Sequence, residues 1–312
     1  MKSYNNIDSY QGGRTKSVIT IGSFDGLHIG HKSILKKIIS YAELNNCESI
    51  VLTFFPHPRM VLDGEDAIKL LNTIKEKKKL FTNIGINNLI THPFDKAFSR
   101  LTAEDFVKKI LVDKLNIQKI IIGYDHRFGR NRSANIKDLI AFGEIYNFEV
   151  EEISAREISE ISVSSTKIRR LLIEGDVETS NKYLGYPYFI TGEVVKGNQI
   201  GRTINFPTAN LKITENYKLI PKNGVYIISC VLEDKTYFGM ANIGTNPTVS
   251  GLEQKIEVHF FDFNKDIYHL KVQVNFHHRI REEIKFDSLE NLKEQLHKDQ
   301  QYSEKYLQKK LL

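Results

Sequence analysis

The sequence predicts an α/β domain built on a parallel sheet, followed by a small antiparallel β-barrel with a terminal helix. In the first half, short apolar runs of strand length alternate with helix-like segments, which is typical of a parallel sheet covered on both faces. After residue 184, alternating strands punctuated by Gly and Asn follow one another, as in a small barrel. We place the border there and expect two domains, residues 1–184 and 185–312.

In the first domain, helix-like spacing of apolar residues marks residues 103–115 and a segment that begins near residue 30. The expected strands are residues 18–21, 49–54, 119–123 and 148–153. Ligands of parallel sheets bind at the carboxyl ends of the strands. Three polar turns, after residues 21, 54 and 123, each follow an expected strand, so we expect them at one edge of the sheet.

In the second domain, five strands and one helix are expected. The strands are residues 189–195, 225–232, 237–243, 255–263 and 270–276. The helix is expected over residues 288–300, with leucines at helical spacing after Ser288 as a possible cap.

Composition narrows the classes of function. The 312 residues are 41% hydrophobic and 26% charged, as in globular proteins, and no apolar run approaches the ~20 residues of a membrane span. Only two cysteines are present, so we expect no disulfide framework and a cytoplasmic location. The net charge of +6 suits polyanionic ligands, but the lysines are scattered, so no nucleic-acid or membrane partner is expected. The oligomeric state is not indicated.

The segment GSFDGLHIGH, residues 22–31, lies between an expected strand and an expected helix. Its glycines let backbone N–H groups approach an anion, and the helix N-terminus adds partial positive charge. His28 and His31 stand three apart and can face one polyphosphate. The alternative is a tight turn with two surface histidines. A Walker A loop is excluded because His31 precedes Lys32-Ser33 where glycine is required, and no zinc-ligand spacing is present.

A second basic motif, SSTKIRR at residues 164–170, has hydroxyl residues at a helix start followed by cations. Basic residues are unfavourable near a helix N-terminus unless an anion is close, which favours a phosphate site. A capped helix with a solvated basic face is the alternative. Similarly, Asp125 within GYDHRFG is either a ligand contact or a turn residue.

The barrel half contains the segment PTAN at residues 207–210. Thr208 and Asn210 offer two oxygen ligands suited to Mg²⁺ held with ATP phosphates; a Pro-Thr turn that ends in an Asn cap is the alternative. Glu257 lies in the alternating strand KIEVHFF, where a solvated polar face is the alternative to a catalytic role.

These motifs, taken in order, resemble the bacterial bifunctional riboflavin kinase/FAD synthetase family. GxFDGxHxGH, GxDxRFG and SSTxIR resemble its adenylyltransferase module, and GRxxxFPTAN, NGVY, NIGxxPT and IEVH resemble its riboflavin kinase module. The resemblance covers nearly the whole chain. It implies a Rossmann-like nucleotidylyltransferase domain, a barrel of riboflavin kinase type, Mg²⁺ as cofactor, and ATP, riboflavin and FMN as substrates.

The resemblance also implies residue roles. Glu257 would be the base of the kinase reaction, and His28, His31 and Arg169 would act in adenylyl transfer. Thr208 and Asn210 would hold Mg²⁺ with ATP. The ATP-phosphate contacts would be Gly22, Phe24, Gly30, Asp125, Ser165, Thr166, Gly201 and Arg202. The flavin contacts would be Phe54, Pro56, His57, Pro58 and Arg281.

Four departures from the family pattern are present. Asn205 and His269 stand where glycine is frequent, Ala134-Asn135 stands where many members have Gly-Asp, and Ser23 stands where the family often has asparagine or another small polar residue. One alternative is therefore an FMN adenylyltransferase whose kinase half has decayed. Another is a flavin-binding regulator that acts on RNA or a partner protein.

Overall fold

The computed structural model describes residues 1–12, 15–123, 126–154, 163–196, 206–248 and 251–311. The chain forms two compact units, Met1–Ser165 and Thr166–Leu312. This division falls before the border expected after Leu184 because helix α8 (Val177–Leu184) packs on the barrel, where Asn181 Nδ2 donates to the Phe276 carbonyl oxygen at 2.8 Å.

The first unit is built on a six-stranded sheet in which every strand pair is parallel. From one edge to the other, its strands are β1 (Lys2–Tyr4), β4 (Asn88–His92), β3 (Glu48–Phe54), β2 (Ser17–Ile21), β5 (Ile117–Gly123) and β6 (Glu149–Ile153). All five residues of β2 are buried, as expected for a central strand covered on both faces. The predicted parallel sheet is confirmed, although β1 and β4 were not expected from the sequence.

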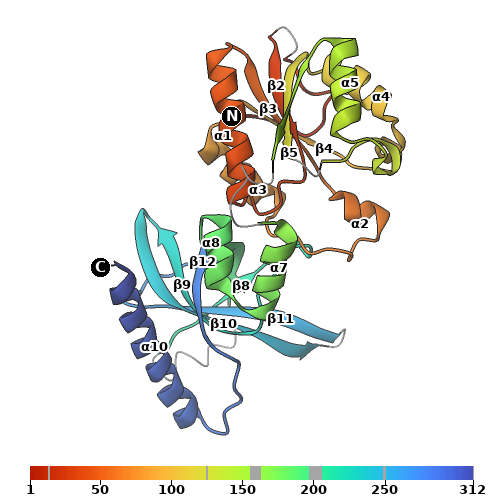
Figure 1. Ribbon diagram of the computed structural model, residues 1–312. Helices are drawn as coiled ribbons and strands as arrows, with labels where there is room; N and C mark the ends of the chain where they lie inside the picture. Colours follow the sequence, from red (N-terminus) through yellow and green to blue (C-terminus); the bar gives the residue numbers. More distant parts are fainter. Residues whose placement is uncertain (13–14, 124–125, 155–162, 197–205, 249–250, 312) are drawn as a thin grey trace. The chain divides into compact units, whose positions relative to one another are not determined.

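Helices cover both faces of the sheet (Figure 1). One core contains side chains of α1 (Ile29–Leu44) and α3 (Ile74–Ile84), and the other contains those of η2 (Phe106–Val112) and α5 (Ile136–Tyr146). The short elements of this unit are α2 (Pro58–Leu62), η1 (Phe98–Arg100), α4 (Ala103–Asp105) and η3 (Arg130–Arg132).

The segment expected as one regular helix over residues 103–115 has a different form. α4 is a single turn, and η2 continues it as a π-helix. Hydrogen bonds join residues five apart, from Asp113 N to Lys108 O at 2.9 Å and from Leu115 N to Ile110 O at 3.0 Å. The apolar face predicted from the spacing is still buried.

The second unit contains a closed antiparallel barrel. Its strands, in order round the barrel, are β10 (Lys235–Thr248), β11 (Gly251–Phe260), β8 (Ala209–Lys212), β7 (Tyr188–Val195), β12 (Lys271–Arg281) and β9 (Gly224–Leu232). The predicted barrel is confirmed, but β8 was not expected as a strand. Helix α7 (Ser165–Glu174) belongs to this unit from Thr166 onward.

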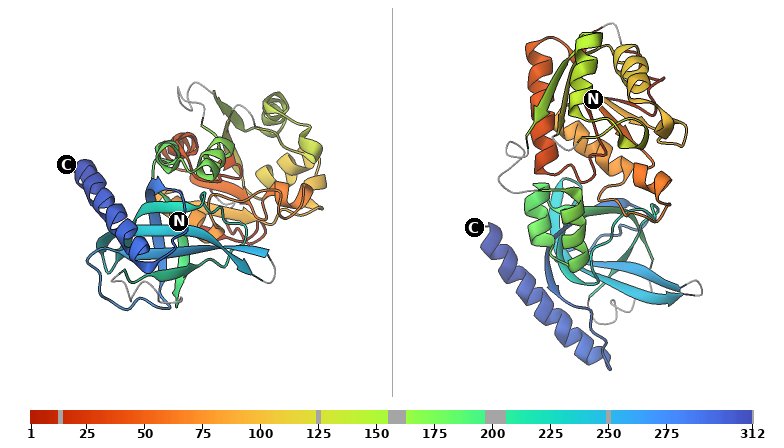
Figure 2. Two further views of the ribbon diagram at one scale, coloured as in Figure 1. Left: turned by 90° about the horizontal axis from the view of Figure 1, so that it is seen from below. Right: turned by 45° about the vertical axis from the view of Figure 1, so that its right-hand side comes forward.

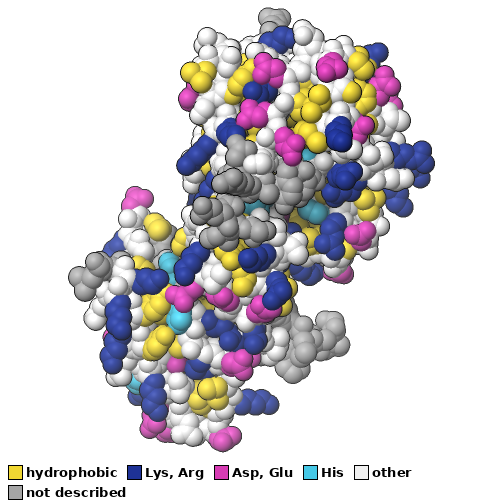
Figure 3. All heavy atoms as spheres, viewed as in Figure 1, with side chains coloured by type: hydrophobic (Ala, Val, Ile, Leu, Met, Phe, Trp, Pro, Cys, Tyr) yellow, Lys and Arg dark blue, Asp and Glu magenta, His cyan; other side chains and the backbone are white. Residues whose placement is uncertain are grey.

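The terminal helix α10 (Leu289–Leu311) lies along the outside of the barrel (Figure 2) and continues well beyond the expected end at residue 300. Its Leu292 and Leu296 pack against a cluster of Phe206, Val225 and Met240. Among the helices of the described residues, none is both long and apolar enough to cross a membrane. On the face drawn in Figure 3, lysine and arginine side chains are interspersed with acidic ones.

Candidate active sites

The turn that joins β2 to α1 forms the first candidate site. The strand order reverses between β2 and β5, because β3 lies on one side of β2 and β5 on the other. At such a reversal the carboxyl ends of neighbouring strands leave a crevice where ligands of α/β sheets bind. The turn follows β2 directly, so it lies at that crevice, as predicted.

His28 and His31 lie side by side at the start of α1. His28 is the N-cap residue, and its Nδ1 accepts the backbone N–H of His31 at 3.3 Å. The two rings stack with centroids 3.6 Å apart and an angle of 17° between their planes. His28 is only 5% exposed, so the alternative of two free surface histidines is wrong.

The environment of His31 keeps its ring neutral. Burial lowers the pKa of His31 well below its ordinary value, and the neighbouring His28 and Lys77 lower it further. Its Nδ1 is buried, and no described residue forms a hydrogen bond with it. Near pH 7 this side chain can therefore supply a hydrogen bond to a phosphate but not a positive charge.

The three glycines of the turn differ in conformation, hydrogen bonding and burial. Gly26 has a φ of 83°, a conformation that glycine adopts without strain. The Gly22 N–H donates to the Leu52 carbonyl oxygen at 3.1 Å and extends the sheet, and the assignment of Gly22 to the ATP phosphates stays a prediction. Gly30 is buried in the first turn of α1. Phe24 is 2% exposed, and its ring lies 5.0 Å from that of His31.

Ser165 is the first residue of α7, as the cluster of hydroxyl residues predicts. Its Oγ donates to the Asp25 carbonyl oxygen at 2.8 Å, so the hydroxyl contacts the phosphate turn itself. Thr166 and Arg169 follow on α7 and belong to the second unit. Arg170 forms an ion pair with Glu174 at 2.9 Å on the exposed side of this helix.

Aromatic side chains gather where β3 and β4 end. The ring of Phe54, at the end of β3, lies 5.7 Å from Phe94 and 5.3 Å from Phe98, and His92 lies 4.6 Å from Phe98. Sequence reasoning selected Phe54 but missed the other three. The available signal was the group of His92, Phe94 and Phe98 directly after the apolar run of β4.

The residues after Phe54 form a turn that leads into α2. Pro56 lies in this turn. His57 is the N-cap residue of α2, and its Nδ1 accepts the Arg59 N–H at 3.2 Å. Pro58 is the first residue of that helix, where its missing N–H is not needed. The turn therefore follows β3 at the same sheet edge as the phosphate turn, as predicted.

In the barrel, Glu257 and Asn210 face each other across paired strands. β11 pairs with β8 so that Glu257 is opposite Asn210. Asn210 is 5% exposed, its Oδ1 is buried, and no described residue donates to that oxygen. Because Asn210 is part of a strand, the alternative in which it caps a Pro-Thr turn is wrong.

The side chain of Glu257 lies on the polar face of β11 that the alternation predicts. It is 32% exposed and forms an ion pair with Lys255 at 2.7 Å, so the alternative of a solvated polar face stays open and the catalytic role stays a prediction. On the same face, the His259 ring nitrogen Nδ1 lies 2.8 Å from the Pro207 carbonyl oxygen. A carbonyl only accepts hydrogen bonds, so His259 Nδ1 carries the proton and holds the residue before Thr208.

Arg281 is engaged within the second unit. Its Nη2 lies 2.7 Å from Asp299 Oδ2 and its Nε donates to the same carboxylate, which ties β12 to α10. Both side chains are largely buried, at 17% and 3% exposure. The geometry therefore gives Arg281 a structural partner, and its assignment to the flavin stays a prediction.

Of the other predicted site residues, Asp125, Gly201 and Arg202 lie outside the described residues, as does Asn205. His269 has a φ of 65°, which confirms that a glycine-favouring turn is present there. Ala134 is 4% exposed and packs in the first unit's core. Among the described residues, no group of three or more His, Cys, Asp or Glu could hold a metal ion.

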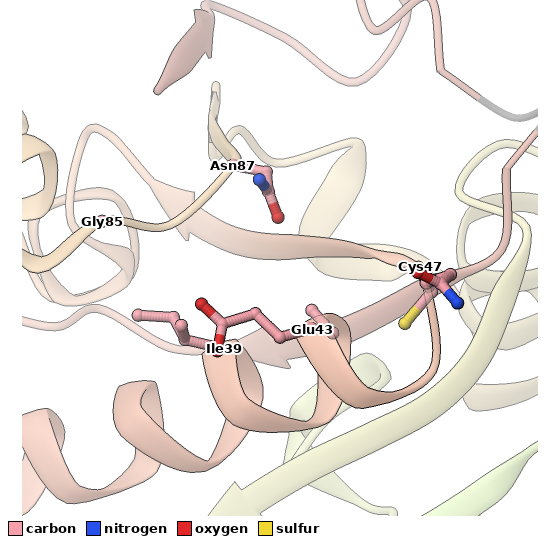
Figure 4. A pocket seen from close by; sticks show the side chains of 7 residues that line it. Ile39, Glu43, Cys47, Gly85 and Asn87 are labelled. Atoms are coloured by element: carbon pink, nitrogen blue, oxygen red, sulfur yellow. The ribbon is translucent and has the colours of Figure 1, made fainter.

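A small pocket of about 250 Å³ lies at the amino ends of strands β3 and β4, whereas the candidate site lies at the carboxyl ends of the strands (Figure 4). None of the predicted site residues contributes to it. It is lined by Ile39, Ala42, Glu43, Asn46, Cys47, Gly85 and Asn87.

Two family models match the chain in succession. The FAD synthetase model matches residues 11–167, and the riboflavin kinase model matches residues 184–307. A protein of Buchnera aphidicola named bifunctional riboflavin kinase/FMN adenylyltransferase is 40% identical over 297 residues, covering 94% of each chain. The chain belongs to the bifunctional riboflavin kinase/FMN adenylyltransferase family.

Other members of this family are similarly close. Proteins of the same name from Listeria monocytogenes and Escherichia coli are 36% and 34% identical, over about nine-tenths of each chain. A crystal structure described as a macrolide-efflux protein from Streptococcus pneumoniae matches with a TM-score of 0.88 and 32% identity, covering 97% of this chain and 98% of that one. The fold of this chain is thus shared with that structure over 97% of its residues.

Proposed function

We propose that this chain converts riboflavin to FMN and then FMN to FAD, consuming one ATP in each step. The observation that carries the proposal is the succession, in one chain, of the FAD synthetase and riboflavin kinase family matches. We assign adenylyl transfer to residues 1–184 and the kinase reaction to residues 185–312, with the cytoplasm as the location.

The kinase reaction needs a base, because a hydroxyl is a weak nucleophile. We assign this role to Glu257. Its carboxylate would take the proton of the terminal ribityl hydroxyl as that oxygen attacks the γ-phosphorus of ATP, and ADP would leave. The register that places Glu257 opposite Asn210 supports this assignment, since it brings the base beside a candidate ATP-metal ligand.

The same part of the barrel fits a magnesium ion. Asn210 Oδ1 is a buried oxygen without a described donor, and carbonyl oxygens are ligands that Mg²⁺ accepts. We assign Asn210 Oδ1 and Thr208 Oγ1 as the protein's contacts to the ion, which would neutralise charge on the ATP phosphates when bound. His259 would hold the preceding carbonyl, that of Pro207, in place.

Adenylyl transfer needs no base, because the attacking FMN phosphate is already an anion. A phosphate oxygen of FMN would attack the α-phosphorus of ATP, and pyrophosphate would leave. The site has to position both substrates and stabilise negative charge. The N-terminus of α1 and the His28 and His31 rings fit this task, and the family resemblance adds Thr166 and Arg169.

The aromatic group beside the phosphate turn fits the flavin. A flavin ring is planar and aromatic, and rings such as those of Phe54 and Phe98 offer it edges and faces. We assign Phe54 and the following turn, Pro56 to Pro58, to the flavin side of the adenylyltransferase site.

A time course tests the proposal. The purified chain is incubated with riboflavin, ATP and Mg²⁺, and the flavins are separated by chromatography. FMN followed by FAD is the expected result. If riboflavin persists while added FMN becomes FAD, the chain is an adenylyltransferase alone. If neither flavin reacts, the enzyme assignment is wrong, and RNA or protein binding becomes the function to test.

A further inference from the structure

The phosphate turn of the first unit holds an unusual backbone conformation. Phe24 and Leu27, neither of them glycine, have φ values of 46° and 33°, and Gly26 between them has 83°. Non-glycine residues are strained in this region and persist there only where their surroundings hold them. The turn that leads to His28 and His31 therefore depends on contacts from elsewhere in the unit.

Two buried donors hold the carbonyl oxygen of Ser23, the residue that enters this turn. Lys77 Nζ donates to it at 2.7 Å, and Thr53 Oγ1 donates at 3.2 Å. Lys77 belongs to α3 and Thr53 to β3, and their exposed fractions are 3% and 0%. The turn is thus fixed to two elements that are distant from it in sequence.

Asp25 ties the middle of the turn to the segment before α3. Its carboxylate, 0% exposed, accepts the backbone N–H of Leu71 at 3.0 Å and that of Asn72 at 3.3 Å. These residues directly precede α3, whose N-terminal capping box joins Thr73 and Glu76. The N-terminal part of α3 and the residues before it therefore contact the turn in two ways. Lys77 donates to the Ser23 carbonyl oxygen, and the Asp25 carboxylate accepts the two backbone N–H groups.

Burying an ammonium group is unfavourable in free energy, and packing alone does not require it. Lys77 lies within the first turns of α3, where the helix dipole disfavours a cation, and burial removes its hydration. Burial lowers the pKa of Lys77, and the charge of Asp25 opposes this shift. An apolar side chain would fill the same space at a lower cost, so the position of this donor calls for a functional reason.

We propose that Lys77 is a positioning residue for adenylyl transfer: by holding the Ser23 carbonyl, it keeps the strained turn in the form that presents His28, His31 and the α1 N-terminus to the ATP phosphates. The inference rests on the proposed function of this turn. It concerns ATP binding in that reaction alone, because the kinase site belongs to the other unit.

The test uses the full chain and three single substitutions. Lys77→Met removes the donor and the charge while retaining most of the side-chain volume. Thr53→Val removes the second donor to the same carbonyl with the same shape. Lys78→Met is the matched control, because it makes the same change at the next residue of α3, where the side chain is exposed. For each variant, kcat and the KM values for ATP and FMN are measured in FAD formation.

For Lys77→Met we expect kcat/KM for ATP in FAD formation to fall on the order of 10²-fold, mainly through a higher KM for ATP, because displaced phosphate contacts have losses of this size. The KM for FMN and the rate of riboflavin phosphorylation should not change. Thr53→Val should show a smaller change in the same parameter, and Lys78→Met should match the parent chain.

Partial unfolding would produce a different result, because it lowers the amount of active enzyme and therefore kcat, but leaves KM for ATP unchanged. A folded Lys77→Met variant with the parent's KM for ATP, or with a loss in kcat alone, would overturn the inference. If Lys77→Met does not fold, Thr53→Val decides, and an unchanged KM for ATP in that variant is the negative result. If the parent chain itself forms no FAD from FMN, the proposed function has failed instead.

Discussion

The two candidate sites hold their chemical groups by different means. In the first unit, the groups sit on a turn whose backbone is strained and whose conformation depends on distant donors, such as Lys77 Nζ to the Ser23 carbonyl and the Leu71 N–H to the Asp25 carboxylate. In the barrel, Glu257 and Asn210 are placed by the register of two hydrogen-bonded strands. A turn can aim several backbone groups and a helix N-terminus at an anion, whereas paired strands set two side chains opposite each other.

The difference matches the chemistry proposed for each site. Transfer to a phosphate nucleophile needs positioning and stabilisation of charge, and transfer to a hydroxyl also needs a base. Substitutions that affect one site while leaving the other reaction as an internal control therefore separate the two assignments.

The largest effect is expected at the barrel site. Glu257→Gln retains the side chain's shape but removes the base, so riboflavin phosphorylation should fall by roughly 10²–10⁴-fold, the usual contribution of general-base catalysis. Conversion of added FMN to FAD should continue at the parent rate. Both rates are followed by chromatography of the flavins, and a normal kinase rate in this variant would refute the role of Glu257.

The complementary change is at the phosphate turn. His28→Asn keeps an acceptor that can cap α1 but removes the imidazole ring, so FAD formation should fall on the order of 10²-fold. In a reaction started from riboflavin, FMN should then accumulate. Equal losses in both reactions would instead point to a folding defect.

Removing the contact between β12 and α10 should lower the stability of the second unit strongly and should not act on one reaction alone. Asp299→Ala leaves the Arg281 guanidinium largely buried without its carboxylate, which costs about 3–5 kcal/mol for a buried pair. Thermal unfolding of the second unit should shift downward. The exposed pair of Arg170 and Glu174 provides the control, because removing Glu174 should change stability by about 0–1 kcal/mol.

Acid should destabilise both units, although their sites differ. Burial lowers the pKa of His31 and His92 in the first unit and of His259 and His277 in the second. Below about pH 6.5 the unfolded chain binds protons that these folded rings do not, so the free energy of unfolding should fall as the pH falls.

Denaturant unfolding measured between about pH 7.5 and 5.5 tests this expectation. The His277→Gln variant should show a shallower slope in the transition of the second unit. An unfolding free energy that is constant over this range would show that the pKa values of these histidines are not lowered in the folded chain.

The smallest effect is expected at His269. Its φ of 65° costs an L-residue about 1–2 kcal/mol, whereas glycine has no such strain but loses about 0.5–1 kcal/mol through its greater freedom in the unfolded chain. His269→Gly should therefore stabilise the barrel slightly, as a small rise in its melting temperature. A fall would show that the contact of His269 Nδ1 with Glu193, at 3.4 Å, outweighs the strain.

Local patterns in the sequence determined much of this protein. The alternation of apolar and polar residues predicted the barrel, and the short apolar runs predicted the parallel sheet. Gly26 predicted the turn, and the Ser165 hydroxyl predicted the start of α7. These signals depend on the conformation of neighbouring residues, which the local sequence controls. The same patterns did not predict β1, β4 or β8, or the π-helical form of η2, since these depend on tertiary packing.

Only the tertiary structure decided which distant residues meet. Nothing in the local sequence distinguishes Lys77 from the neighbouring lysines of α3, yet it is buried against Ser23, fifty-four residues earlier. The Gly22 amide is bonded to Leu52, and Arg281 is joined to Asp299 of a helix that continues beyond its expected end. Strand order, register and burial set these pairings, and they arise when the chain folds as a whole rather than from any one segment.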